Sequence, residues 1–285
     1  MSTVYLNGNY LPMSEARISP MDRGFLFGDG IYEVIPSYEG RLMGFTPHME
    51  RMQNGLNAIE IPLQLDHAQW REIAAQLSAR NGGGNLGIYL HISRGADTKR
   101  DHAYPTDIAP TVFAFAYPIA AAPVPDKRSV TPFTVTTAED LRWQRCNIKS
   151  TSLLGNVMHY QQAKAGGHNE TILYNQHGEI TEAAACNVFI VKNGVVATPL
   201  LDTHKLPGIT RYMLLEILRR DGNIKIEERV VTLDELRTAD EVWLSSSSKD
   251  IVPVIAVDGI AVADGKIGDV WLAAQTLYSK HKFDF

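Results

Sequence analysis

Cysteine and concentrated positive charge are both scarce in this 285-residue sequence. Its two cysteines, Cys146 and Cys186, are too few for a disulfide framework and lack the spacing of a zinc site. Lys and Arg number 27 against 32 Asp and Glu, which gives a net charge of −5, and no long basic cluster occurs. Binding to nucleic acid is therefore not expected.

Long apolar runs are also absent. The longest apolar stretch, residues 108–122, is interrupted by Pro110 and Pro118 and falls short of the roughly 20 residues that cross a membrane. The first residues show no basic segment followed by an apolar one, so no signal peptide is expected. Because 45% of the residues are hydrophobic, as is typical of globular proteins, the composition favours a cytoplasmic enzyme that makes no membrane contact.

Several common site motifs are missing as well. The glycine clusters at residues 28–30 and 82–84 do not follow the G-x-G-x-x-G order between a strand and a helix, so a dinucleotide site is not expected. Neither G-x-S-x-G nor H-E-x-x-H occurs. The nine histidines are scattered along the chain, and we predict no metal site.

The first half of the chain mixes strands with two helices. Runs of strand-forming residues predict strands at residues 3–6, 31–38, 41–45, 86–93 and 111–117. A helix is predicted to begin with Thr46 as N-cap and Pro47 as its first residue. A second helix is predicted to begin at Asp66, with Gln69 in the capping-box position, and to end at Asn81.

A proline-rich segment separates the two halves. Residues 118–126 hold three prolines among alanines, which makes a stiff connector between a first domain, 1–117, and a second, 127–285. In the second domain the pattern predicts strands at residues 130–136, 170–174, 187–192 and 195–198, and helices at 153–164, 210–220 and 269–280. Two mixed α/β lobes fit this pattern best.

Two segments have the composition of an anion site. Gly208 and Thr210 stand where a helix is predicted to begin, and the first N–H groups of a helix point at a bound anion. Thr210 would either cap the helix or bond the anion, and an ordinary capped helix start explains the same residues. Four serines at residues 245–248 follow an apolar strand and are either phosphate ligands or a plain loop.

The segment of residues 22–34, DRGFLFGDGIYEV, is more specific. It closely resembles the N-terminal signature of pyridoxal-phosphate enzymes of fold type IV, which include D-amino-acid aminotransferases, branched-chain aminotransferases and aminodeoxychorismate lyases. Four more segments match in order, at residues 48–51, 142–150, 181–189 and 208–211, and the serine run follows them. The resemblance implies a small N-terminal α/β lobe, a larger barrel-like C-terminal α/β lobe and pyridoxal 5'-phosphate as cofactor.

The resemblance also implies a role for individual residues. Lys149 would be the Schiff-base lysine and proton shuttle, and Glu182 would hold the pyridine nitrogen. The phosphate would be bound by Arg51, Gly208, Ile209, Thr210, Ser246 and Ser247. The substrate would face Tyr32 and Val34. Taken without the resemblance, Lys149 and Arg51 are solvated charges, Glu182 is an exposed carboxylate at a strand end, and Tyr32 is equally a core residue.

The subfamily depends on how the substrate carboxylate is held. Arg100 and His102 form an Arg-x-His pair like the one that D-amino-acid aminotransferases use as a carboxylate trap, in homodimers where this loop reaches in from the neighbouring subunit. The alternative for these residues is a polar surface loop. Relatives commonly have hydroxyl residues after the glutamate, whereas this chain has alanine at 183–185, which leaves the substrate preference less defined.

The expected reaction is therefore transfer of an amino group from a D-amino acid to a 2-oxo acid by a homodimer. Three alternatives share part of the pattern. A branched-chain L-aminotransferase would have the same cofactor site, and an (R)-amine transaminase would have no need of a carboxylate trap. A non-catalytic pyridoxal-phosphate-binding protein would bind the cofactor but would not need Lys149, Tyr32 and the trap loop together.

Overall fold

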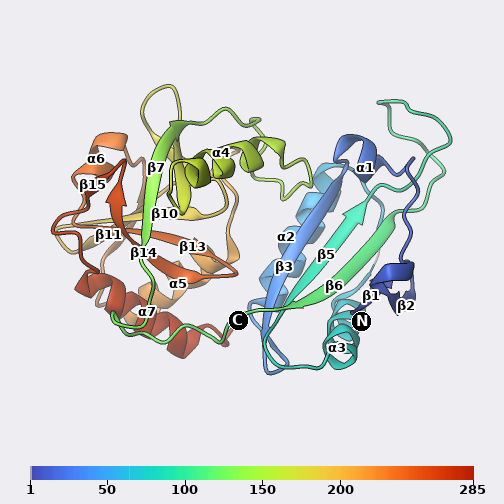
Figure 1. The fold of residues 1–285 in the computed structure, drawn as a ribbon, viewed down its shortest axis with the longest axis horizontal. Coiled ribbons are helices and arrows are strands. Elements are labelled where there is room, and N and C mark those ends of the chain that lie inside the picture. The colour runs from blue at the N-terminus through green and yellow to red at the C-terminus, as the bar shows by residue number, and fades with distance from the viewer. Residues whose placement is uncertain (1, 64) are drawn as a thin grey trace. The chain divides into compact units, whose positions relative to one another are not determined.

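The computed structural model describes residues 2–63 and 65–285, and the chain forms two compact units (Figure 1). The first unit takes the described residues up to Ala121, together with Ile148–Leu153 and Phe285. The second unit takes Ala122–Asn147 and Leu154–Asp284. A division of the chain at residues 118–126 would place Ile148–Leu153 in the second domain, but this segment, which contains Lys149, belongs to the first unit.

The first unit is an antiparallel sheet with helices on one face. Its strand order is β2-β1-β6-β5-β3-β4, and the strands are β1 (Thr3–Leu6), β2 (Asn9–Pro12), β3 (Gly30–Tyr38), β4 (Arg41–Leu42), β5 (Leu86–Ser93) and β6 (Thr111–Pro118). The helices are α1 (Arg23–Phe27), α2 (Phe45–Ala58) and α3 (His67–Arg80), and a short 3₁₀ helix covers Met13–Glu15. Apolar residues of α2 and α3, such as Met52 and Trp70, form the core with Ile31 and Ile88 of the sheet.

The two helix starts in the first unit had different outcomes. At α3 the capping box is confirmed, because Asp66 accepts from the Gln69 N–H and Gln69 accepts from the Asp66 N–H. At α2 the N-cap prediction was wrong, because the helix begins at Phe45 and the N-cap is Gly44, which caps with no side chain. Gly44 has φ of 59°, a left-handed conformation that glycine adopts without a steric cost, and the strand expected at 41–45 ends at Leu42.

The second unit is a curved mixed sheet of nine strands. The order is β12-β11-β10-β13-β14-β7-β8-β9, and β15 pairs with β14. Parallel pairs are β7 with β8, β7 with β14 and β11 with β12, and the other pairs are antiparallel. The end strand β9 also approaches β10 and β11, so the sheet curls toward a barrel. This mixed α/β architecture with a barrel-like second unit confirms the expected fold class.

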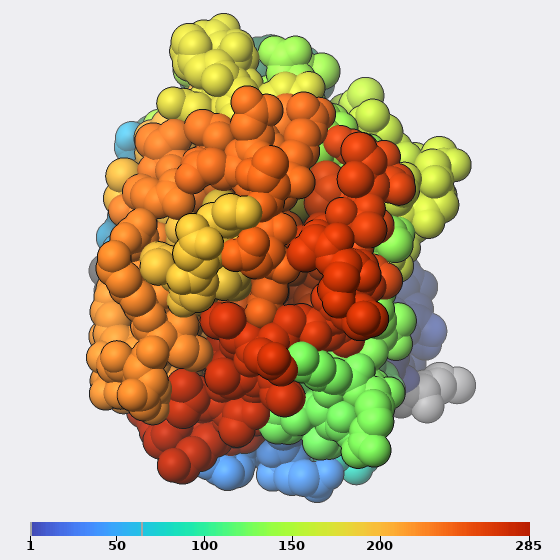
Figure 2. All heavy atoms as spheres, turned by 90° about the vertical axis from the view of Figure 1, so that its left-hand side faces the viewer, coloured from blue at the N-terminus to red at the C-terminus, as the bar shows by residue number. Residues whose placement is uncertain are grey.

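The seven elements whose positions were predicted in the second unit lie within three residues of those positions, and the remaining strands and α6 had no predicted range. The strands are β7 (Phe133–Glu139), β8 (Glu170–Tyr174), β9 (Ile180–Ala183), β10 (Asn187–Lys192), β11 (Val195–Pro199), β12 (Ile226–Arg229), β13 (Glu241–Ser246), β14 (Asp250–Val257) and β15 (Ile260–Ala261). The helices are α4 (Leu154–Ala165), α5 (Ile209–Asp221), α6 (Leu233–Arg237) and α7 (Asp269–His281). In Figure 2 the dark red atoms of α7 lie in the lower left part of the face shown. No helix among the described residues is both long and apolar enough to cross a membrane.

A buried carboxylate joins α7 to the sheet. Glu241 accepts hydrogen bonds from the N–H groups of Val270 (3.0 Å) and Trp271 (2.8 Å) in the first turn of α7, and from the indole N–H of Trp243 (2.9 Å). A carboxylate at this end of a helix is favoured by the helix dipole. Gly268 is the N-cap, and a Cβ at that position would lie 1.9 Å from Cδ of Glu241.

We therefore expect Gly268→Ala to displace the Glu241 carboxylate and lower the free energy of unfolding by about 1–3 kcal/mol, as overpacking does elsewhere. The measurement is the Tm by scanning calorimetry. The matched control is Gly166→Ala, whose added Cβ meets the ring of His168 at 3.2 Å and no backbone atom closer than 3.5 Å. An equal loss of Tm in the two variants would contradict the role given to Glu241.

Candidate functional site

Lys149 lies beside Tyr32 because the segment before α4 pairs with the start of β3. The N–H of Tyr32 donates to the carbonyl of Lys149 (3.0 Å), the N–H of Thr151 donates to the carbonyl of Gly30 (3.0 Å), and Ile31 and Ser150 form a bridge. The Nζ atom of Lys149 lies 4.1 Å from the centre of the Tyr32 ring. The half-buried Lys149 is thus fixed against an aromatic ring and is not the solvated charge of the alternative interpretation.

Two glycines of the N-terminal signature permit this approach. A Cβ on Gly30 would lie 2.7 Å from the carbonyl oxygen of Ile92, and one on Gly28 would lie 2.4 Å from Oγ of Ser152. Gly28 also has φ of 67°, so two separate constraints select glycine there. The glycines of residues 28–30 therefore hold the segment of Lys149 against β3 and do not form a nucleotide loop.

Glu33 faces the opposite side of β3 from Tyr32, since side chains alternate along a strand. Its carboxylate accepts from Nε and Nη2 of Arg51, each at 2.7 Å, and lies 2.7 Å from Nδ1 of His48. The side chains of Glu33 and His48 are fully buried. Arg51 is therefore an oriented, nearly buried guanidinium on α2 and not a solvated residue.

The charges around Glu33 control its protonation. Burial raises the pKa of the Glu33 carboxyl, but Arg51 and His48 outweigh burial and lower that pKa to about 2. Burial lowers the pKa of the His48 imidazole, and Glu33 opposes that shift. The Glu33 carboxylate consequently stays ionised at neutral pH and fixes the orientation of Arg51.

In the second unit, Glu182 on β9 is buried and held by three donors. Its carboxylate accepts from Nη1 of Arg142 (2.6 Å), from the N–H of Leu206 (2.9 Å) and from Nδ2 of Asn187 (3.3 Å). The alternative interpretation of Glu182 as an exposed carboxylate is therefore wrong. Burial raises the pKa of Glu182, and the contacts with Arg142 and Leu206 oppose this rise.

Arg142 and Asp140 form a second layer that the sequence reasoning did not single out. Asp140 accepts from Nε (2.9 Å) and Nη2 (2.7 Å) of Arg142 and from the hydroxyl of Thr181 (2.7 Å). Burial opposes the charge of Arg142, yet Asp140 and Glu182 outweigh burial and raise the pKa of the guanidinium. The only available signal was the position of Arg142 within the lysine-bearing segment of residues 142–150.

The start of α5 lies against Asn187. Gly208 is the N-cap, and a Cβ there would lie 1.9 Å from Oδ1 of Asn187, whose Nδ2 donates to the carbonyl of Leu206 (2.9 Å). No side chain caps the helix, so of the two roles considered for Thr210, helix capping is not observed. The hydroxyl of Thr210 is buried without a hydrogen-bond partner in the described part of the chain.

The serine run comes to the same place. Ser245 at the end of β13 pairs with Asn187 of β10, and its buried hydroxyl also has no partner among residues 2–63 and 65–285. Ser246 is the last residue of β13, and Ser247 follows in the turn before β14. Two unpartnered hydroxyls and an uncapped helix start therefore surround Asn187, an arrangement that suits an anion with several oxygens.

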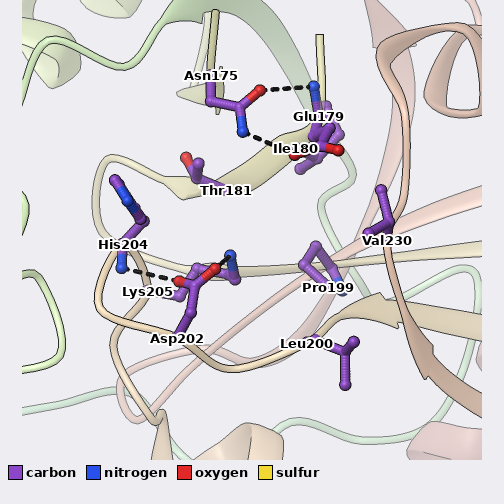
Figure 3. Close-up of a pocket in the computed structure, with 10 residues that line it drawn as sticks. All are labelled: Asn175, Glu179, Ile180, Thr181, Pro199, Leu200, Asp202, His204, Lys205 and Val230. Atoms are coloured by element: carbon purple, nitrogen blue, oxygen red, sulfur yellow. Dashed lines mark hydrogen bonds and ion pairs between the residues drawn. The ribbon is translucent and has the colours of Figure 1, made fainter. Parts of the chain in front are cut away.

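A small pocket lies beside β9, and Thr181 is one of the residues that line it (Figure 3). Its side chains are already paired: Lys205 contacts Asp202 at 2.6 Å, and Asn175 donates to Glu179 at 2.8 Å. This pocket borders the Glu182 strand but does not include Glu182 or the residues around Asn187.

The loop of Arg100 and His102 joins β5 to β6, and both side chains are exposed. Cζ of Arg100 lies 4.9 Å from the centre of the Phe27 ring, and the His102 ring lies 5.3 Å from it. The observed contacts of this pair are therefore made with α1.

Comparisons with known proteins identify the family. Residues 30–257 match the family described as amino-transferase class IV. The chain is 36% identical over 283 residues to a D-alanine aminotransferase of Staphylococcus haemolyticus, covering 99% of this chain and 98% of the relative. It is 34% identical over 267 residues to a D-alanine aminotransferase of Listeria monocytogenes, covering 94% of this chain and 91% of the relative.

Solved structures show the same fold. A branched-chain amino acid aminotransferase from Escherichia coli superposes with a TM-score of 0.85 at 24% identity, covering 96% of this chain and 92% of that one. A branched-chain aminotransferase from Thermoproteus uzoniensis superposes with a TM-score of 0.86 at 23% identity, covering 99% and 95% of the two chains.

The buried ion pairs of Glu33 predict a specific pH dependence. Since the pKa of Glu33 is lowered from 4.5 to about 2, the stabilisation by its carboxylate is complete above pH 4.5 and is lost as the pH falls toward 2. We expect Glu33→Gln to cost about 3–5 kcal/mol at neutral pH, because it removes the carboxylate that pairs with a buried guanidinium. The difference in Tm between the variant and the parent should shrink between pH 4.5 and 2.

Thermal unfolding followed by circular dichroism from pH 2 to 7 measures this difference. The control is Glu50→Gln, an exposed residue of α2 beside Arg51, which should leave the Tm nearly unchanged throughout. A constant difference between the Glu33→Gln variant and the parent over the whole range would refute the assignment.

Proposed function

The chain belongs to the amino-transferase class IV family, and we propose that it uses pyridoxal 5'-phosphate to move the amino group of a D-amino acid, such as D-alanine or D-glutamate, to a 2-oxo acid, such as 2-oxoglutarate or pyruvate. The observation that carries the proposal is the 34–36% identity to D-alanine aminotransferases over nearly the whole chain. The contact of Lys149 with Tyr32 supports it.

The donor groups of the chain fit the cofactor. The unpartnered hydroxyl of Thr210 and the uncapped start of α5 offer hydrogen bonds to a phosphate, and we assign the phosphate to Gly208, Ile209, Thr210, Ser246 and Ser247. Arg51 would supply a positive charge to the phosphate, and Glu33 fixes the orientation of its guanidinium. Glu182 would hold the ring nitrogen, and Arg142 keeps the Glu182 carboxylate in place.

The chain's own residues then divide the work. When bound, the cofactor withdraws electrons from the substrate Cα and makes its proton acidic. Lys149 would hold the cofactor through Nζ, and the same Nζ would act as the base that takes the proton from the substrate Cα and as the acid that gives it up again later in the reaction. Tyr32 and Val34 line the substrate side of β3, and the Tyr32 ring limits where Nζ can lie.

Arg100 and His102 would bind the substrate carboxylate. A fixed carboxylate determines which face of Cα meets Lys149, so orientation selects the D-enantiomer. A planar guanidinium is suited to this task because it donates two parallel hydrogen bonds to a carboxylate. The proposal includes a homodimer, in which this loop serves the site of the neighbouring subunit, as the family resemblance implies. It also includes a cytoplasmic location, which the composition favours.

A panel of amino donors tests the substrate class. We expect the purified protein, with cofactor added, to transfer the amino group of D-alanine to 2-oxoglutarate at least about 100-fold more efficiently than that of L-leucine, as binding in one orientation permits. The measurement is kcat/KM for each donor. A preference for L-leucine would replace the proposal with a branched-chain aminotransferase, and a preference for (R)-1-phenylethylamine with an (R)-amine transaminase.

Lys149 has a separate test. We expect Lys149→Ala to abolish the visible absorbance of the cofactor-loaded protein and to lower the rate with D-alanine by about 10²–10⁴-fold or more, because the proton carrier is removed. The matched control is Lys164→Ala, since Nζ of Lys164 also lies over a tyrosine ring, that of Tyr160, at 5.3 Å. If the Lys149→Ala protein kept both the absorbance and the rate, the proposed role of Lys149 would be excluded. A parent protein that is coloured but inert with every donor would instead be a non-catalytic binding protein.

A further inference from the structure

Arg23 is a buried arginine that the proposed reaction does not use. It is the first residue of α1, its side chain is only 3% exposed, and its Nε donates to Oδ2 of Asp29 at 2.8 Å. A guanidinium is costly to bury unless its charge is paired and its N–H groups are bonded. The destinations of its remaining donors therefore show what this residue fixes.

Those donors go to the loop of Arg100 and His102. Nη1 of Arg23 donates to the carbonyl of Asp101 at 2.5 Å, and Nη2 donates to the carbonyl of His102 at 3.2 Å. The two acceptors are consecutive backbone groups, so one rigid fork fixes two neighbouring peptide units. The backbone that carries the Arg-x-His pair is thereby bonded to a buried side chain, although the pair itself is exposed.

Phe27 lies one turn after Arg23 on α1 and contacts the pair's side chains. The guanidinium carbons of Arg23 and Arg100 each lie 4.9 Å from the centre of the Phe27 ring, and the His102 ring lies 5.3 Å away at 42°. An aromatic ring attracts such cations within about 6 Å. The short helix α1 thus holds the loop by its backbone through Arg23 and by its side chains through Phe27.

Asp29 connects this arrangement to the core of the first unit. It also accepts from Arg94, whose guanidinium donates to the carbonyls of Ile59 (2.6 Å) and Glu60 (3.0 Å) at the end of α2. Burial raises the pKa of Asp29, but Arg94 and Arg23 outweigh burial and lower it, so the carboxylate stays charged at neutral pH. Asp29 is therefore a fixed anchor for Arg23.

We propose that Arg23, anchored by Asp29, is a positioning residue that sets the backbone of residues 100–102 and so aims Arg100 and His102 at the substrate carboxylate. The inference rests on the proposed role of that pair. It implies that the loss of the Arg23 fork weakens the binding of every substrate that has a carboxylate, both amino acid and 2-oxo acid. A donor without a carboxylate makes no use of the pair and is unaffected.

The test uses Arg23→Met in the cofactor-loaded protein, because methionine keeps an apolar stem against Phe27 and removes the N–H donors. We expect KM for D-alanine and for 2-oxoglutarate to rise by about 10–100-fold with kcat within about threefold, since misplacement by about 1 Å has effects of that size. The kcat/KM for (R)-1-phenylethylamine should stay within about twofold of the parent's own value. A purely structural defect would instead lower kcat for both kinds of donor.

Hydrogen exchange supplies a readout that is independent of activity. The amides of residues 101–103 should exchange faster in Arg23→Met than in the parent, because the loop loses the two hydrogen bonds that Arg23 donates to its backbone carbonyls. The matched control is Arg94→Met, which is equally buried and shares Asp29 but donates to the carbonyls of Ile59 and Glu60 and meets the loop at the ring of Tyr104. A KM rise of the same size in Arg94→Met would overturn the inference in favour of general destabilisation.

The outcomes separate the inference from the function on which it rests. Arg100→Met should raise the same KM values as Arg23→Met; if Arg100→Met leaves them unchanged, the carboxylate role of the pair fails and the inference with it. If Arg100→Met raises them while Arg23→Met does not, the positioning role alone is overturned. Should Arg23→Met not fold, Asp29→Asn keeps the shape of the anchor and weakens its charge, and a KM rise in the same direction is required.

Discussion

The backbone pairing between Lys149 and Tyr32 is the constraint on which the first unit's site depends. It adds a segment that is distant in sequence to the free edge of β3, and β3 then distributes chemistry by its alternation. Tyr32 on one face contacts Nζ of Lys149, and Glu33 on the other face orients Arg51. One strand of the antiparallel sheet therefore fixes a lysine, an aromatic ring and a guanidinium without any of them lying on a mobile loop.

In the second unit, hydrogen bonds between buried polar groups hold the site residues in place. Asn187 bonds to Glu182, supports the start of α5 and pairs with Ser245, so a single amide joins the carboxylate to the anion-binding turn. Arg142 forms ion pairs with both Glu182 and Asp140. A network in which nearly every member is hydrogen-bonded holds its geometry well. The two hydroxyls that have no partner among the described residues are the groups that a ligand could hydrogen-bond.

Local signals in the sequence were informative where the local chain decides the structure. The capping box at Asp66 depends on residues three apart, and the structure confirms it. Thr46 also has the composition of an N-cap, but α2 begins earlier because Gly44 takes a left-handed turn that ends β4. Propensity alone does not distinguish between two such starts, since the position of the helix is determined by its packing against the sheet.

Apart from the two anion-site candidates at residues 208–210 and 245–248, the site was accessible to sequence reasoning only through resemblance. Composition does not separate Lys149 from the other lysines, and the pairing with β3 joins residues more than a hundred positions apart. Arg142 and Glu182 are 40 positions apart and Arg23 and Asp101 are 78 apart, so the local sequence does not reveal these pairs either. The family signature identified the segments, but only the structure assigns partners to their charges.

The assignment of Ile148–Leu153 to the first unit has a consequence for how the chain is made. A nascent chain that has emerged only as far as Ala121 holds all six strands of the first sheet but lacks the segment that pairs with Gly30–Tyr38 at its start. Domains generally fold as units during synthesis, N-terminal part first. Here that order is broken: the first unit is completed only after the opening stretch of the second, residues 122–147, has also left the ribosome.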